Sequence, residues 1–231
     1  MIRNYKALGL AVMAMFAFSA MMAQGAAANP LTVPDGIAKV FITGTNHPNE
    51  SHEFVVPGSP AVKCTHSLYS GSATVTAGQV NEITLTPTYT GCSAFGFATA
   101  DVNTNNCHFT LTTPTKLKTG EVTWDTAAGK EHIHVICTGK PIEITPTSFG
   151  VSVCTQFVNT QTPTSGHLVA RNAGTTEDMT LTDEVTVKGI HYTGTGGPCG
   201  TSGTNAEYSG KTIARCYANE THTIRNQCTF S

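Results

Sequence analysis

Apolar and polar residues alternate with a period of two along most of the chain, and this pattern constrains the fold more than any other feature. It is seen in Lys39-Val40-Phe41-Ile42, in His108-Phe109-Thr110-Leu111-Thr112 and in Glu184-Val185-Thr186-Val187-Lys188. Successive side chains of a β-strand point to opposite faces, so the pattern predicts strands with one buried face. Gly, Pro and Asn residues separate the stretches. We therefore expect an all-β fold of antiparallel strands.

The amino-acid composition favours the same fold class and limits the partners. Thr occurs 39 times in 231 residues, and a β-branched residue suits a half-exposed strand surface better than a helix. Only 12% of the residues are charged, and the formal net charge is −2. The sequence contains no run of Lys and Arg that could form the basic patch required for nucleic-acid binding. We expect no nucleic-acid partner.

The first 28 residues have the features of a secretory signal peptide. Arg3 and Lys6 precede an apolar segment from Ala7 to Met22, and small residues follow up to Ala28. Signal peptidase recognises this order of charge, apolar run and small residues. The apolar run is shorter than a membrane-spanning helix. We expect cleavage after Ala28, with Gly25 as an alternative site, and a secreted mature chain without membrane association.

All eight cysteines lie in the part expected to be exported, where disulfides are the usual state. Structural zinc is the alternative, but the sequence contains no CxxC pair. Local spacing favours a bridge from Cys92 to Cys107 and another from Cys137 to Cys154, since each pair brackets a short strand-turn-strand stretch. We expect disulfides that stabilise the fold by restricting the unfolded chain.

A weak internal duplication relates the two halves of the mature chain. Residues 40–44 (VFITG) resemble residues 135–139 (VICTG), and the segment 81–92 resembles the segment 183–199. Long-period similarity in conserved order is a sign of repeated units. The sequence thus predicts two related halves.

The duplication divides the chain into a signal peptide at 1–28, a first β half at 29–118 and a second β half at 119–231. Each half has about the size of an immunoglobulin-like sandwich, of roughly 100 residues. Two small β domains and one larger sandwich of two related halves both fit. Equivalent halves would also pair Cys199 with Cys216 and leave Cys64 and Cys228 for a long-range bridge.

Two segments of the sequence suggest a family. The stretch 186–193 (TVKGIHYT), followed by Gly197-Pro198-Cys199, and the stretch 87–96 (PTYTGCSAFG) resemble secreted, Thr-rich, cysteine-containing β proteins of unknown function from soil actinobacteria. The resemblance covers most of the mature chain. It implies an exported β-rich protein and assigns no catalytic residues. Cys216 and Cys228 depart from the commoner pattern of these proteins.

His132 and His134 are the candidate metal ligands. They are two residues apart on an expected strand, so both side chains project from one face, as in HxH ligand pairs. A third ligand would have to come from elsewhere, and His108 or Glu143 could supply it. The interpretation that we favour places the two histidines on a solvent-facing side, with the alternate residues, such as Ile133, in the core.

Three further motifs fall short of a catalytic or metal site. Asp101-Val102-Asn103-Thr104-Asn105 begins like a calcium loop but lacks the later Gly and Glu, so an Asn-rich turn is expected. Gly150-Val151-Ser152-Val153-Cys154 lacks the second Gly of a nucleophile elbow. The adjacent acids Asp183 and Glu184 point to opposite faces of a strand and are interpreted as solvated.

These observations favour an exported, non-catalytic binding or structural module with no cofactor. An extracellular glycan or protein is the expected type of partner. A carbohydrate-binding or adhesive module is the first alternative, and an exposed Trp124, the only Trp of the chain, would favour it. A metal-dependent enzyme that uses His132 and His134 is the second.

Overall fold

The computed structural model describes residues 31–34, 36–76, 78–112, 115–118, 121–126, 132–174, 179–226 and 228–230. Within these ranges the regular structure consists of β-strands and one short 3-10 helix, η1 (Gly197–Cys199). The predicted all-β fold class is confirmed. The predicted signal peptide, 1–28, lies outside the described residues.

The described residues contain 18 strands, which follow one another along the chain. The first nine are β1 (Leu31–Thr32), β2 (Lys39–Asn46), β3 (His52–Val55), β4 (Val62–Thr76), β5 (Gln79–Ala94), β6 (Ala98–Asn103), β7 (His108–Thr112), β8 (Thr115–Lys118) and β9 (Glu121–Asp125). The others are β10 (Ile133–Ile136), β11 (Ile142–Ser148), β12 (Val151–Ser152), β13 (Gln156–Val158), β14 (Ser165–Gly174), β15 (Met179–Gly194), β16 (Ser202–Tyr217), β17 (Arg225–Asn226) and β18 (Thr229–Phe230). All pairings between these strands are antiparallel, as the alternation predicts.

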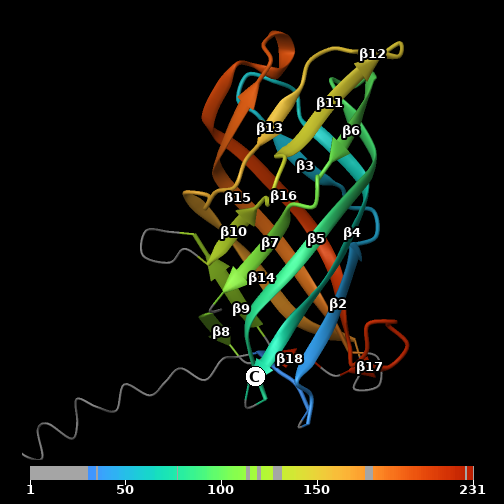
Figure 1. Ribbon diagram of the computed structural model, residues 1–231, viewed down its shortest axis with the longest axis vertical. Coiled ribbons are helices and arrows are strands. Elements are labelled where there is room, and N and C mark those ends of the chain that lie inside the picture. The colour runs from blue at the N-terminus through green and yellow to red at the C-terminus, as the bar shows by residue number, and fades with distance from the viewer. Residues whose placement is uncertain are drawn as a thin grey trace, which may run out of the picture.

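The strands form one sheet that closes on itself (Figure 1). From β4 the pairings lead through β5, β6, β11, β13, β15 and β16 to β2 and β3, both of which pair with β4. Elsewhere in the closed sheet, β7 pairs with both β5 and β10, and β14 pairs with both β9 and β15. The facing strands therefore belong to a single sheet, and one apolar core lies inside it.

Strands from the two predicted halves pair with each other. β2 pairs with β16, where Phe41 lies opposite Tyr217 and Asn46 lies opposite Thr212. β6 pairs with β11 in the same way. The predicted boundary between residues 118 and 119 falls between β8 and β9, which also pair. The two halves share one sheet and one core, while their origin by duplication stays a prediction.

β15 shows how the sequence pattern sets which side chains face inward. The predicted stretch 184–188 belongs to this strand, in which Leu181 and Val187 are buried. A register shift follows at Gly189, whose φ of 70° favours glycine and marks a β-bulge. The bulge adds one residue to the alternation, so Ile190 is the next buried position.

All eight cysteines form disulfides, but the predicted pairing is wrong. The four bridges are Cys64–Cys92, Cys107–Cys137, Cys154–Cys199 and Cys216–Cys228. The bridges predicted from spacing and from the duplication, Cys92–Cys107, Cys137–Cys154, Cys199–Cys216 and Cys64–Cys228, are not formed.

Strand register explains the observed pairing. Cys64 and Cys92 lie directly opposite each other in the β4–β5 hairpin. His108 lies opposite Ile136 in the β7–β10 pair, so the next residues outward, Cys107 and Cys137, are also neighbours. Sulfur atoms must come close to bond, and register decides this rather than the distance along the chain. Four disulfides are characteristic of an oxidising environment.

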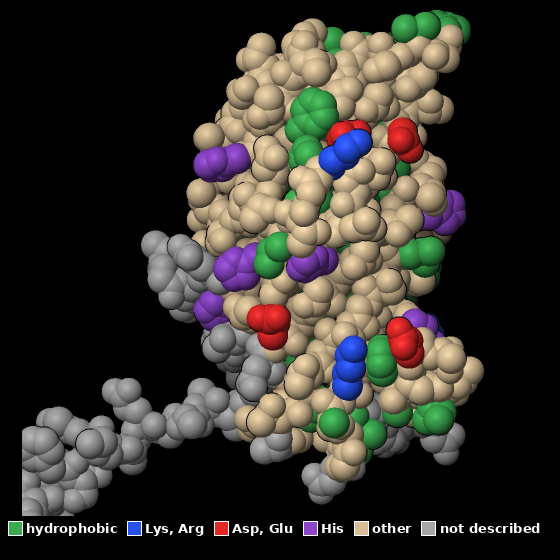
Figure 2. Space-filling view, in the orientation of Figure 1, with side chains coloured by type: hydrophobic (Ala, Val, Ile, Leu, Met, Phe, Trp, Pro, Cys, Tyr) green, Lys and Arg blue, Asp and Glu red, His purple; other side chains and the backbone are tan. Residues whose placement is uncertain are grey.

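The surface carries few charged groups. Figure 2 shows them scattered over a face that consists mostly of uncharged polar side chains and backbone, in keeping with the low charged fraction of the sequence. Within the described ranges, no helix has the length and apolar character needed to cross a membrane.

Candidate functional site

A cavity of about 170 Å³ lies within the closed sheet. Aliphatic and aromatic side chains from strands all around the sheet form most of its wall, and Phe109 and Trp124 are among the aromatic ones. The space exists because some of the inward-facing residues are small. Gly44 of β2 lies opposite Ala214 of β16, and both line the cavity. The cavity offers an apolar space inside the sheet for another molecule.

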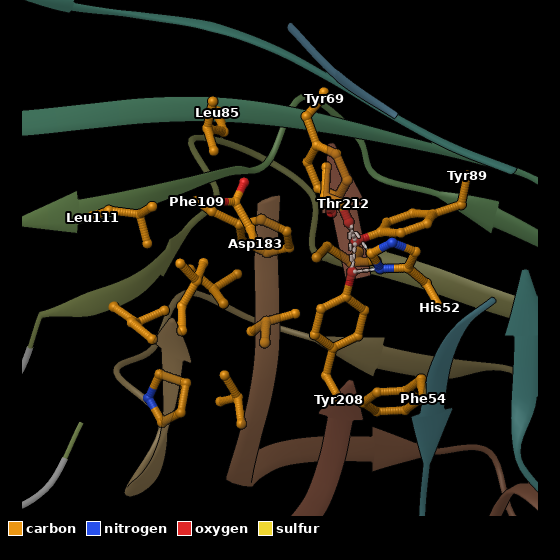
Figure 3. A pocket seen from close by; sticks show the side chains of 18 of the residues that line it. His52, Phe54, Tyr69, Leu85, Tyr89, Phe109, Leu111, Asp183, Tyr208 and Thr212 are labelled. Carbon is orange, nitrogen blue, oxygen red and sulfur yellow. Dashed lines mark hydrogen bonds between the residues drawn. The ribbon is translucent and has the colours of Figure 1, made fainter. Parts of the chain in front are cut away.

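Four polar side chains meet at one place in the cavity wall (Figure 3). The Tyr208 hydroxyl lies 2.6 Å from the Tyr69 hydroxyl, 2.9 Å from the Tyr89 hydroxyl and 2.6 Å from Nδ1 of His52. The Tyr69 hydroxyl is also 3.2 Å from the same His52 nitrogen. These residues come from β3, β4, β5 and β16, and we call them the tyrosine–histidine cluster.

The hydrogen bonds of His52 assign its protonation. Nε2 lies 3.2 Å from the backbone carbonyl oxygen of Lys211, which can only accept, so Nε2 carries a proton. Burial lowers the pKa of His52 to about 4, and the bond to the carbonyl offsets part of this shift. The imidazole is therefore neutral at pH 7, and its Nδ1 accepts a hydrogen bond from a tyrosine.

Gly210 makes room for the His52 ring. A Cβ atom at this position would collide with the imidazole, in particular with Nδ1. Gly210 lies on β16 between the inward-facing residues Tyr208 and Thr212. A side chain here would thus displace the ring from the cluster.

The cluster offers acceptors rather than donors to the cavity. Burial raises the pKa of all three phenols above the usual value, so each keeps its proton at pH 7. Each of these protons has an acceptor inside the cluster, either another hydroxyl oxygen or Nδ1 of His52. The lone pairs of the tyrosine oxygens that are not used within the cluster can accept hydrogen bonds from a bound molecule.

Asp183 places a single carboxyl in the apolar part of the wall. It follows Leu181 and precedes Val185 in the inward-facing series of β15, and all three line the cavity. Figure 3 shows its side chain pointing into the space beside Phe109. Burial raises the pKa of Asp183 from 3.8 to about 7. No hydrogen bond or ion pair joins the carboxyl group of Asp183 to another residue of the described ranges.

The cavity position of Asp183 corrects its interpretation as a solvated residue. The adjacent Glu184 is exposed, as expected. Asp183, however, is in phase with the apolar residues of the strand, so the same alternation that buries Leu181 turns Asp183 inward. This phase was the signal that could have identified it.

The structure places the candidate metal ligands on and directly before β10. His134 lies on β10, and its Nδ1 is 2.9 Å from the Thr162 hydroxyl. His132 immediately precedes that strand. Among the described residues, no three His, Cys, Asp or Glu side chains gather as a metal site would require. The expected alternation is confirmed, because Ile133 and Val135 are buried.

The other candidate residues are also located. Trp124 is only 2% exposed and lines the cavity, so it offers no flat surface platform for a sugar. The Asn-rich segment forms a turn between β6 and β7, as predicted, with Asn105 and Asn106 in left-handed conformations. Ser152 lies on the short exposed strand β12.

No known protein family, curated protein or solved structure matches this chain. The resemblance to the actinobacterial proteins therefore stays a prediction.

Proposed function

We propose that the protein is an exported, non-catalytic binding protein that holds a small, largely apolar molecule inside its closed sheet. The cavity of about 170 Å³ carries this proposal. Apolar cavities of roughly 150 Å³ bind benzene or xenon. Each Å² of apolar ligand surface that leaves water contributes about 25 cal/mol.

Export is the second part of the proposal. The N-terminal 28 residues have the charge and apolar pattern of a signal peptide. Four disulfides are stable in the oxidising environment that secreted proteins meet. Both features favour a protein that meets its ligand outside the cytosol.

A binding role fits the polar groups of the cavity better than catalysis does. His52 is held by hydrogen bonds at both ring nitrogens and is difficult to protonate, which suits a fixed structural partner rather than a proton carrier. The buried position of Trp124 gives no support to the carbohydrate-binding alternative.

Trp124 provides a direct readout of ligand entry. It is the only Trp of the chain and lines the cavity. Bromobenzene quenches Trp fluorescence through its heavy atom when the two are in contact. We expect saturable quenching of the wild-type protein by bromobenzene, because the ligand occupies a site of fixed capacity. Titration followed by fluorescence measures this.

A cavity-filling variant provides the control. In Val185→Phe the larger ring enters the space that bromobenzene needs, so saturable quenching is expected to disappear. Thr186→Phe adds the same ring at the adjacent outward position and is expected to quench like wild type. Weak, non-saturating quenching that is equal in all three proteins would contradict the proposed function.

A further inference from the structure

We propose that the ligand is a small organic amine, bound as its cation, with its ammonium group against the Asp183 carboxylate and its hydrocarbon part among the apolar side chains. This inference rests on the proposed binding function and adds the chemical class of the ligand. Three properties of the cavity support it.

The first property is the isolation of the Asp183 carboxyl. It projects from the cavity wall between Leu181 and Val185 and has no partner in the described part of the chain. Burying a carboxyl without a partner is costly, and burial has raised its pKa to about 7. Perturbed groups of this kind cluster at functional sites. A ligand cation would supply the missing partner.

The second property is the charge of the lining. It includes two carboxyl side chains, those of Glu53 and Asp183, and no Lys or Arg. Glu53 already has a partner, since its carboxylate lies 2.7 Å from Nζ of Lys63. His52 is neutral because of its low pKa. An anionic ligand would find no counter-charge in this lining, whereas a cationic ligand would find one at Asp183.

The third property is the hydrogen-bonding character of the wall. The tyrosine–histidine cluster uses its own protons internally and presents oxygen lone pairs. An ammonium group has donors and no acceptor, so it is complementary to such a surface. The rings of Phe109 and Tyr69 line the same cavity as the Asp183 side chain. Aromatic faces also attract cations.

The proposal predicts how affinity depends on pH. The other titratable groups that line the cavity are those of His52, Glu53, Tyr69, Tyr89 and Tyr208. His52 stays neutral and the tyrosines stay protonated between pH 5 and pH 8, because burial lowers the pKa of the imidazole and raises the pKa of the phenols. The Asp183 carboxyl, with a pKa of about 7, must lose its proton to pair with an ammonium group. Amine affinity should rise about tenfold per pH unit up to pH 7 and then level off.

Three compounds of the same shape separate the contributions of charge, hydrogen bonding and apolar contact to the affinity. Benzylamine is a cation at neutral pH, benzyl alcohol is a neutral donor, and ethylbenzene has no polar group. At pH 8 we expect benzylamine to bind at least about tenfold more tightly than ethylbenzene, the gain of a charge-assisted hydrogen bond. Competition with bromobenzene for Trp124 quenching measures all three.

Variants of the two adjacent acids test the role of Asp183. Asp183→Asn is expected to remove the preference for benzylamine and its pH dependence, while ethylbenzene affinity changes less than about twofold, because that ligand makes no charged contact. Glu184→Gln changes the exposed neighbour on the same strand and should retain the preference.

The outcomes separate the two proposals. If ethylbenzene binds and benzylamine binds no more tightly, the amine inference is overturned and the apolar binding function stands. The same conclusion follows if benzyl alcohol binds most tightly, or if Asp183→Asn keeps the amine preference. If none of the three compounds competes with bromobenzene, the proposed function itself fails.

Discussion

Replacing Asp183 with asparagine is expected to stabilise the protein at pH 8 and to leave its stability almost unchanged at pH 4. The carboxyl has a pKa of about 7 in the folded protein and 3.8 ordinarily. The folded state therefore binds more protons than the unfolded state between these values, and stability falls as the pH rises through this window. At about 1.4 kcal/mol per pKa unit, ionised Asp183 costs up to about 4 kcal/mol at pH 8.

Urea unfolding with the disulfides intact, at both pH values, tests this expectation. Asparagine has nearly the same shape as aspartate but does not ionise, so it avoids the cost at pH 8. Glu184→Gln, at the exposed adjacent position, should change the free energy of unfolding by less than about 0.5 kcal/mol. A less stable Asp183→Asn protein at pH 8 would show that the carboxylate has a favourable partner, which contradicts its isolation.

In the Asp183→Asn background, the free energy of unfolding should fall by about 3 kcal/mol between pH 6.5 and pH 4. The cause is His52, whose pKa is about 4 in the folded protein and 6.5 ordinarily. The unfolded state binds more protons in this range, so stability is lost as the pH falls. In wild type the opposite dependence of Asp183 offsets this loss, and the profile should be flatter.

A pH series of urea unfolding on three proteins separates the two groups. The Asp183→Asn protein should lose stability towards pH 4, and the double variant with His52→Gln should not, since glutamine does not titrate. An equally steep profile in the double variant would assign the effect to another residue. A flat profile in Asp183→Asn alone would contradict the burial of a neutral His52.

The alternation of residues was sufficient to predict several of the strands and their buried faces. It correctly indicated β2, β7 and β15. Within β15, Asp183 is two residues from Leu181 and from Val185, so the alternation also predicts that its side chain points inward. That signal was missed because an acid beside another acid is usually solvated. In this strand the apolar residues on either side, Leu181 and Val185, show which face points into the core, and Asp183 lies on that face.

The tyrosine–histidine cluster could not be predicted from the sequence in the same way. Tyr69 and Tyr208 are 139 residues apart, and only the pairing of β4, β3 and β16 brings them together. His52 lies on a strand of four residues, and its ring fits only because Gly210 has no side chain. The disulfide pairing was wrong for the same reason, because it depends on register between strands rather than on local spacing.

Both proposals depend on the internal cavity, and a crystal structure determined under xenon pressure tests whether the folded protein contains it. Xenon binds in apolar cavities of this size, and its anomalous scattering locates it without ambiguity. We expect a xenon peak in the space bounded by Leu85, Phe109 and Val185. No internal peak, together with side chains packed across that space, would contradict the proposed binding site.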